Sequence, residues 1–104
     1  MAELTNREFA ALWFDDVADK TRKLTSGNVS HDSAMIRGLA KNSVEYLDEF
    51  GEKDDELLEK AKGWFKDIAS LCERITPGNV SHMAATIRGK AIRCREYIKK
   101  HIND

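Results

Sequence analysis

Two identical stretches carry the side chains best suited to chemistry in this chain. Gly-Asn-Val-Ser-His occurs at 27–31 and again at 78–82, and an arginine follows each histidine by six residues. Amide, hydroxyl, imidazole and guanidinium groups can all donate hydrogen bonds to an anion, and the amino end of a helix adds free N–H groups. The candidate ligand-binding residues are therefore Asn28, Ser30, His31, Arg37, Asn79, Ser81, His82 and Arg88.

The two stretches belong to an internal repeat with a constant offset of 51 residues. Positions 4–50 and 55–101 are identical at 19 of 47 sites without a gap, and Trp13 to Tyr46 reappears as Trp64 to Tyr97. Shared residues indicate a shared constraint or a recent duplication. Loop formation and helix capping account for much of the identity, so structural retention is the preferred interpretation and a ligand site is the alternative.

Apolar residues recur at helical spacing over about 5–24 and 54–75, and again after each shared stretch. Gly27 and Gly78 suit a left-handed residue that ends a helix, and Ser30 and Ser81 suit the N-cap of the next one. Short connections favour antiparallel neighbours. The sequence predicts an all-α, up-down-up-down four-helix bundle, built as one domain (1–104) from two tandemly duplicated hairpins, at 4–50 and 55–101.

Hairpin geometry predicts specific contacts within each copy. A turn centred near residue 27 puts Asp16 level with Arg37, and the same alignment holds for Asp67 and Arg88, so we expect an ion pair in each hairpin. Gly38 and Gly89 follow these arginines and are expected to allow close approach of the helices.

Each copy also holds a Trp-Phe pair, Trp13-Phe14 and Trp64-Phe65. Neighbouring residues differ by about 100° around a helix, so both rings of a pair cannot face the centre of the core. We expect one ring of each pair to lie near the surface or on the seam between the two hairpins.

Composition limits the class of protein. Charged residues make up 34% of the chain and apolar residues 41%, and there is one proline, which is typical of a helical domain and not of a disordered chain. No apolar run reaches the roughly 18 residues of a membrane span, and no basic-then-apolar leader opens the sequence. We expect a cytoplasmic protein that does not associate with membranes.

The charge is unevenly divided. Residues 1–51 carry 6 basic and 9 acidic side chains, whereas 52–104 carry 11 and 9, for a net charge of −1. This small total argues against nucleic-acid binding. Cys72 and Cys94 would lie roughly 16 Å apart along a hairpin, which is too far for a disulfide.

Catalytic signals are weak. No serine, cysteine and histidine arrangement indicates an activated nucleophile, and no histidine stands at zinc-ligand spacing from a cysteine or carboxylate. The acidic run Glu52, Asp55, Glu56 and Glu59 resembles the carboxylate clusters of metal-dependent helical nucleotide hydrolases, but such a run also suits a solvated helix start. An enzyme of this kind is the third interpretation, and we predict no catalytic residue, no resident metal and no cofactor.

The first functional expectation is a small non-enzymatic binding protein, a regulator, inhibitor or adaptor, that acts through contacts with a protein partner. The alternative is a receptor or sequestering protein for a nucleotide-like anion at the end of the bundle that carries both shared loops. A ligand with two-fold symmetry, such as a cyclic dinucleotide, would suit two copies of one half-site. A homodimer is compatible with either interpretation.

Overall fold

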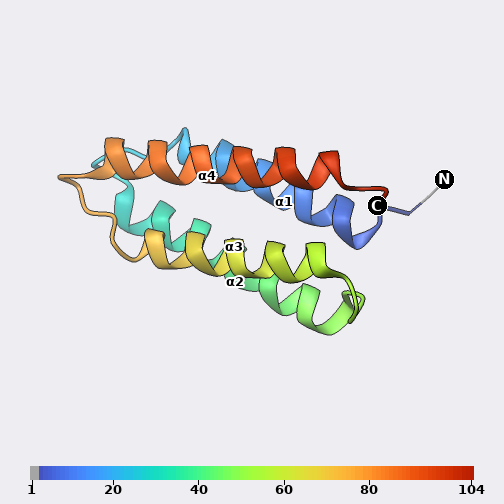
Figure 1. The fold of residues 1–104 in the computed structure, drawn as a ribbon. Coiled ribbons are helices and arrows are strands. Elements are labelled where there is room, and N and C mark those ends of the chain that lie inside the picture. Colours follow the sequence, from blue (N-terminus) through green and yellow to red (C-terminus); the bar gives the residue numbers. More distant parts are fainter. Residues whose placement is uncertain (1–2) are drawn as a thin grey trace.

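The computed structural model describes residues 3–104 as four α-helices (Figure 1). The helices are α1 (Asn6–Thr21), α2 (Val29–Phe50), α3 (Glu56–Cys72) and α4 (Val80–Lys100). Residues 3–104 contain no strand, so the prediction of an all-α chain with four helices is confirmed. The helices lie along one long axis, in a molecule measuring 41 × 26 × 23 Å.

The connections gather at the two ends of the molecule. Figure 1 shows the α1–α2 and α3–α4 loops at one end, and the α2–α3 loop with both termini at the other. The two shared stretches therefore lie at the same end.

Side chains cap the first helix of each hairpin. In α1, the Glu8 N–H donates to the Thr5 hydroxyl (3.1 Å) and the Thr5 N–H donates to the Glu8 carboxylate (2.9 Å), which forms a capping box. In α3, the Asp55 carboxylate accepts from the N–H groups of Leu57 (2.9 Å) and Leu58 (3.2 Å). These bonds satisfy amides that the helix itself leaves without partners.

The ends of α1 and α3 differ from the prediction. Both helices finish three residues early, at Thr21 and Cys72. No described glycine has a positive φ, so the left-handed assignment of Gly27 and Gly78 is wrong. After α1 the N–H groups of residues 22–24 donate to the carbonyls three positions earlier, at 3.2 Å each, and this tight right-handed winding removes the need for a left-handed residue.

The starts of α2 and α4 also differ from the prediction. The helices begin at Val29 and Val80, so Asn28 and Asn79 occupy the N-cap positions. The assignment of Ser30 and Ser81 as N-caps is therefore wrong. Both serines lie inside the first helical turn and are exposed.

Long-range packing pairs the helices in a way that hairpin reasoning does not anticipate. The most extensive contacts join α1 to α4 and α2 to α3, while the contacts within each hairpin are fewer. At the centre of the molecule the Phe14 and Phe65 rings stack, with centroids 3.9 Å apart and planes 2° from parallel. Buried alanine, valine, leucine and isoleucine side chains from all four helices surround this pair.

The predicted ion pairs are absent from the part of the chain that the structure describes. Asp67 meets Lys90 at 3.5 Å and not Arg88, and among residues 3–104 no ion pair joins Asp16 to Arg37.

The predicted role of Gly38 and Gly89 is also wrong. A Cβ atom built on Gly38 would meet no atom within 4 Å, and one on Gly89 would meet only the flexible end of Arg93 in the same helix, at 3.2 Å. Neither glycine is needed for close approach of two helices.

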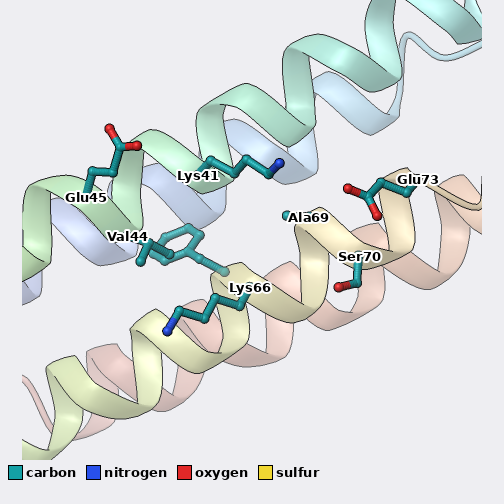
Figure 2. Close-up of a pocket in the computed structure, with 8 residues that line it drawn as sticks. Lys41, Val44, Glu45, Lys66, Ala69, Ser70 and Glu73 are labelled. Carbon is teal, nitrogen blue, oxygen red and sulfur yellow. The ribbon is translucent and has the colours of Figure 1, made fainter.

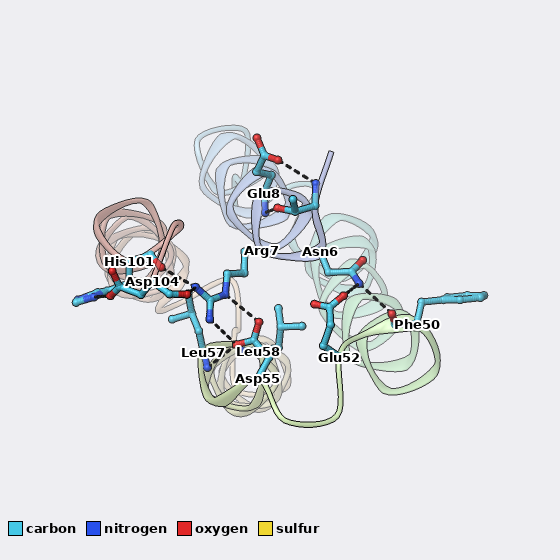
Figure 3. A network of polar contacts seen from close by, with 11 residues as sticks. Asn6, Arg7, Glu8, Phe50, Glu52, Asp55, Leu57, Leu58, His101 and Asp104 are labelled. Carbon is cyan, nitrogen blue, oxygen red and sulfur yellow. Dashed lines mark hydrogen bonds and ion pairs between the residues drawn. The ribbon is translucent and has the colours of Figure 1, made fainter. Parts of the chain in front are cut away.

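At the end of the bundle that holds the termini, polar contacts connect different helices (Figure 3). The Arg7 guanidinium donates to the Asp55 carboxylate through Nε (2.8 Å) and Nη2 (3.1 Å). Its Nη1 donates to the backbone carbonyls of His101 (2.8 Å) and Asp104 (2.9 Å). One side chain of α1 thus joins the start of α3 to the segment after α4.

Candidate functional site

Asn28 and Asn79 hold their own loops in shape. The Asn28 carboxamide accepts from the Thr25 N–H (2.8 Å) and donates to the Lys23 carbonyl (2.9 Å). Asn79 repeats both bonds, with the Thr76 N–H (2.7 Å) and the Arg74 carbonyl (3.1 Å). Structural retention therefore explains why these two asparagines recur.

The threonines complete the same motif. The Thr25 hydroxyl accepts from the Asn28 N–H (3.3 Å), and the Thr76 hydroxyl accepts from the Asn79 N–H (3.2 Å). Sequence reasoning missed both threonines, although their identity at the 51-residue offset was a visible signal.

The other predicted site residues do not converge. His31, His82, Ser30 and Ser81 are exposed in the first turns of their helices. Arg37 and Arg88 are half-buried, two turns further along. The eight candidate residues line none of the five surface hollows that the structure places among residues 4–104. Their common feature is position at one end of the bundle.

One feature of that end does favour an anion. The Asn28 and Asn79 side chains form hydrogen bonds to loop backbone and make no capping bond to the helices that follow. The first amides of α2 and α4 therefore lack a side-chain cap, and the helix dipole favours negative charge there.

The acidic run has structural partners. Glu52 accepts from the Asn6 carboxamide (2.8 Å), Asp55 binds Arg7, and Glu59 pairs with Lys62 at 2.7 Å. Burial raises the Asp55 pKa, but the Arg7 guanidinium and the Leu58 and Leu57 amides outweigh it, so that the net Asp55 pKa is lowered. Within residues 3–104, no group of three or more His, Cys, Asp or Glu side chains is placed to hold a metal ion.

The two cysteines are free, buried thiols. Burial raises the pKa of both Cys72 and Cys94 to about 11, which keeps them protonated and poorly nucleophilic at neutral pH. They pack as small apolar side chains.

An aromatic seam runs between α1 and α2, and we define it as Phe9, Trp13, Tyr46 and Phe50. Trp13 stacks on Phe9 (centroids 5.6 Å apart) and meets Tyr46 edge-on (5.2 Å), and Tyr46 in turn contacts Phe50 (4.8 Å). The Phe50 side chain is 57% exposed, and Figure 3 shows its ring directed away from the bundle.

The equivalent seam between α3 and α4 is polar at its edges. Trp64 and Tyr97 repeat the edge-on contact at 5.5 Å. Lys60 replaces Phe9 and lies 5.3 Å from the Tyr97 ring centroid, and His101 replaces Phe50 at 4.6 Å from that ring. The outer rings of the aromatic seam are therefore specific to the first copy.

The two copies also differ in polarity at the positions of the other exposed apolar side chains. Leu4 (43%), Leu12 (46%) and Met35 (50%) are exposed in the first copy. At the 51-residue offset the second copy holds Asp55, Gly63 and Thr86. Sequence reasoning placed one ring of each Trp-Phe pair near the surface or on the seam between the hairpins. In the structure Trp13 and Trp64 are half-buried, and each meets a tyrosine of its own hairpin edge-on. Sequence reasoning missed the one-sided exposure.

Among residues 3–104, no helix is long and apolar enough to cross a membrane. Comparisons with protein-family models, with curated proteins and with solved structures found no match to this chain.

Proposed function

We propose that this chain is a small non-enzymatic binding protein that docks a protein partner on the aromatic seam, on Leu12 of α1 and on Leu4, which precedes α1. The observation that carries the proposal is one-sided exposure: Phe50, Leu12 and Leu4 are 57%, 46% and 43% exposed, and the second copy has polar residues or glycine at the same positions. Exposed apolar and aromatic side chains are typical of protein interfaces. Phe50 belongs to the seam between α1 and α2, whereas Leu4 and Leu12 line a hollow with Lys99 of α4, so the proposed surface extends across α1.

Charge suggests the kind of partner surface. Residues 1–51 have three more acidic than basic side chains, and Asp16, Asp19 and Glu49 lie exposed on the helices that bear the seam. A partner that presents an apolar patch with basic residues at its rim would complement this surface and would associate faster at low salt.

The two copies provide a matched experiment. A photo-crosslinking amino acid is placed at position 12 in one variant and at the equivalent exposed position 63 in another, and the proteins crosslinked in cells are identified by mass spectrometry. The proposal expects a discrete partner at position 12 and not at position 63. Equal crosslinking at both positions, or none at position 12, would contradict it.

Affinity for the captured partner then tests the seam itself. The variant Phe9→Lys/Phe50→His installs the residues of the second copy and should weaken binding at least about tenfold, a modest value for two interface aromatics. Lys60→Ala/His101→Ala changes the equivalent positions and should leave the affinity unchanged. Circular dichroism and thermal melting show whether each variant is folded.

A second candidate function is capture of a nucleotide-like anion at the end that carries the shared loops. The uncapped first turns of α2 and α4 support it. Its test is thermal melting with inorganic phosphate, nucleotides and cyclic dinucleotides, using wild type and His31→Ala/His82→Ala. A ligand at a hundredfold over its Kd adds about 2.7 kcal/mol of stability. No shift in the wild type would reject this function.

The proposed history is duplication of a helical hairpin, giving an up-down-up-down bundle with a pseudo-two-fold axis. Contacts that recur at the 51-residue offset support it: Trp13–Tyr46 and Trp64–Tyr97, and the two asparagine-closed loops. We further propose a cytoplasmic location and no catalytic activity. A homodimer remains compatible with the seam.

A further inference from the structure

A hollow lies between α2 and α3, on a different surface from the aromatic seam. It has a volume of about 360 Å³. Figure 2 shows it opening between the two helices, with Val44 and Ala69 beside its base. Its lining consists of Lys41, Val44, Glu45, Phe65, Lys66, Ala69, Ser70 and Glu73.

The internal repeat shows how this crevice differs from its counterpart. The equivalent crevice between α4 and α1 is crossed by an ion pair from Arg95 to Asp15. At the 51-residue offset the α2–α3 crevice holds Val44 in place of Arg95 and Lys66 in place of Asp15. Neither side chain can form that bridge. At the positions where an ion pair crosses the α1–α4 crevice, the α2–α3 crevice therefore has no equivalent bridge.

The base of the hollow is apolar and firmly held. Phe65 is fully buried and Ala69 is 6% exposed. Phe65 is fixed by its stack on Phe14, and further along the same crevice Lys62 joins Asp48 at 2.9 Å. A preformed apolar floor of this kind suits a small ligand that needs no rearrangement of the protein.

Opposite charges stand at one end of the hollow. Figure 2 shows Lys41 reaching from α2 and Glu73 from α3 toward the same opening, whereas Glu45 and Lys66 point away from it. Within the described part of the chain, neither Lys41 nor Glu73 takes part in an ion pair. The end of the hollow thus offers one cation and one anion beside an apolar floor.

We propose that this hollow binds an apolar α-amino acid as its zwitterion. The carboxylate would face Lys41, the ammonium group would face Glu73, and the side chain would lie against Val44, Phe65 and Ala69. The volume is at the lower end of the range of about 300–1,000 Å³ seen for ligand pockets, which fits an amino acid better than a nucleotide. Two charges of opposite sign select a zwitterion over either single ion.

The test measures amide chemical shifts by NMR during titration with L-phenylalanine and L-leucine. We expect saturable shifts at residues of α2 and α3 around 41–45 and 65–73. 3-Phenylpropionate lacks the ammonium group and 2-phenylethylamine lacks the carboxylate, so each should bind at least about tenfold more weakly than phenylalanine.

Two variants assign the binding to this hollow. Val44→Arg/Lys66→Asp installs the bridge of the other crevice and should abolish the shifts while the protein stays folded. Lys41→Met removes only an exposed charge and should weaken phenylalanine binding about tenfold without affecting 2-phenylethylamine. Lys99→Met, on the opposite side of the bundle, is the matched control and should bind like wild type.

The proposal is overturned if the wild type shows no saturable shift with either amino acid. It is equally overturned if binding survives Val44→Arg/Lys66→Asp, or if the single-charge analogues bind as well as phenylalanine. These outcomes leave the protein-docking proposal untouched, because the aromatic seam and the hollow share no residue.

Discussion

The rings of Phe14 and Phe65 stack face to face at the centre of the molecule, with centroids 3.9 Å apart. The two residues are equivalent at the 51-residue offset, and both are fully buried. The two copies therefore meet in the core through the same residue of the repeat. Each copy thus supplies the other's central packing partner.

Substitution of either ring should therefore destabilise the whole bundle. We expect Phe14→Leu and Phe65→Leu each to lower the free energy of unfolding by about 1–2 kcal/mol, measured by urea denaturation. In the double variant the two losses should couple by about 0.5–1.5 kcal/mol, because both remove the same stack. Phe50→Leu, at a 57% exposed position, is the control and should change little. Strict additivity would argue against a stacked pair.

The asparagine-closed loops lead to a second prediction. Asn28→Ala and Asn79→Ala each remove two side-chain hydrogen bonds to loop backbone and should lower stability by about 1–3 kcal/mol. His31→Ala and His82→Ala change exposed side chains and should stay within about 0.5 kcal/mol of wild type. Thermal melting and urea denaturation distinguish the two classes. Equal losses for asparagine and histidine would show that the loops depend on more than these bonds.

Local patterns were sufficient to predict the helices but not their neighbours. Apolar periodicity located all four helices within about three residues, because it reflects burial of one helix face. The 100° rule for Trp13 and Phe14 succeeded for the same reason. The predicted Asp16–Arg37 ion pair failed because it assumed that helices joined by a loop are closest neighbours. Here α1 packs chiefly on α4, a long-range choice that hairpin register does not encode.

The candidate site was predicted less well than the fold. Recurrence correctly identified Asn28 and Asn79 as constrained, but a recurring residue reports a constraint without stating its chemistry. Their side chains bind loop backbone. The aromatic seam and the α2–α3 hollow arise where the copies differ, at positions such as Phe50 and Val44. A comparison that looks only for residues shared by the two copies does not find such positions.

Glycine substitutions provide a third prediction, because Gly38 and Gly63 have open surroundings whereas Gly51 is crowded. A Cβ atom on Gly38 or Gly63 would meet no atom within 4 Å, so alanine at either helical position should raise stability by about 0.5–1 kcal/mol. A Cβ atom on Gly51 would lie only 2.4 Å from the Leu47 carbonyl oxygen. Gly51→Ala should therefore destabilise by about 1–3 kcal/mol. A stabilised Gly51→Ala variant would show that the backbone at this position can move at little cost.

The Arg7–Asp55 contact predicts a specific pH dependence. Burial raises the Asp55 pKa, but hydrogen bonds from Arg7, Leu58 and Leu57 lower it by more, so the folded pKa lies below the ordinary value of 3.8. Between the two pKa values, the carboxylate therefore stays charged in the folded protein while it binds a proton in the unfolded chain. The resulting stabilisation is complete well above pH 3.8 and is lost as the pH falls through the folded pKa.

Asp55→Asn tests this sign directly, since asparagine can still accept the Leu57 and Leu58 hydrogen bonds as an N-cap but carries no charge. The variant should be less stable than wild type at pH 7, and the difference should shrink as urea denaturation is repeated below pH 4. Asp48→Asn is the matched control, because Lys62 lowers the Asp48 pKa too, yet the Asp48 side chain is 59% exposed. Solvent screens such a pair, so its variant should show a much smaller pH-dependent difference. A constant gap between Asp55→Asn and wild type from pH 7 to pH 3 would mean that the Asp55 charge contributes no net stability.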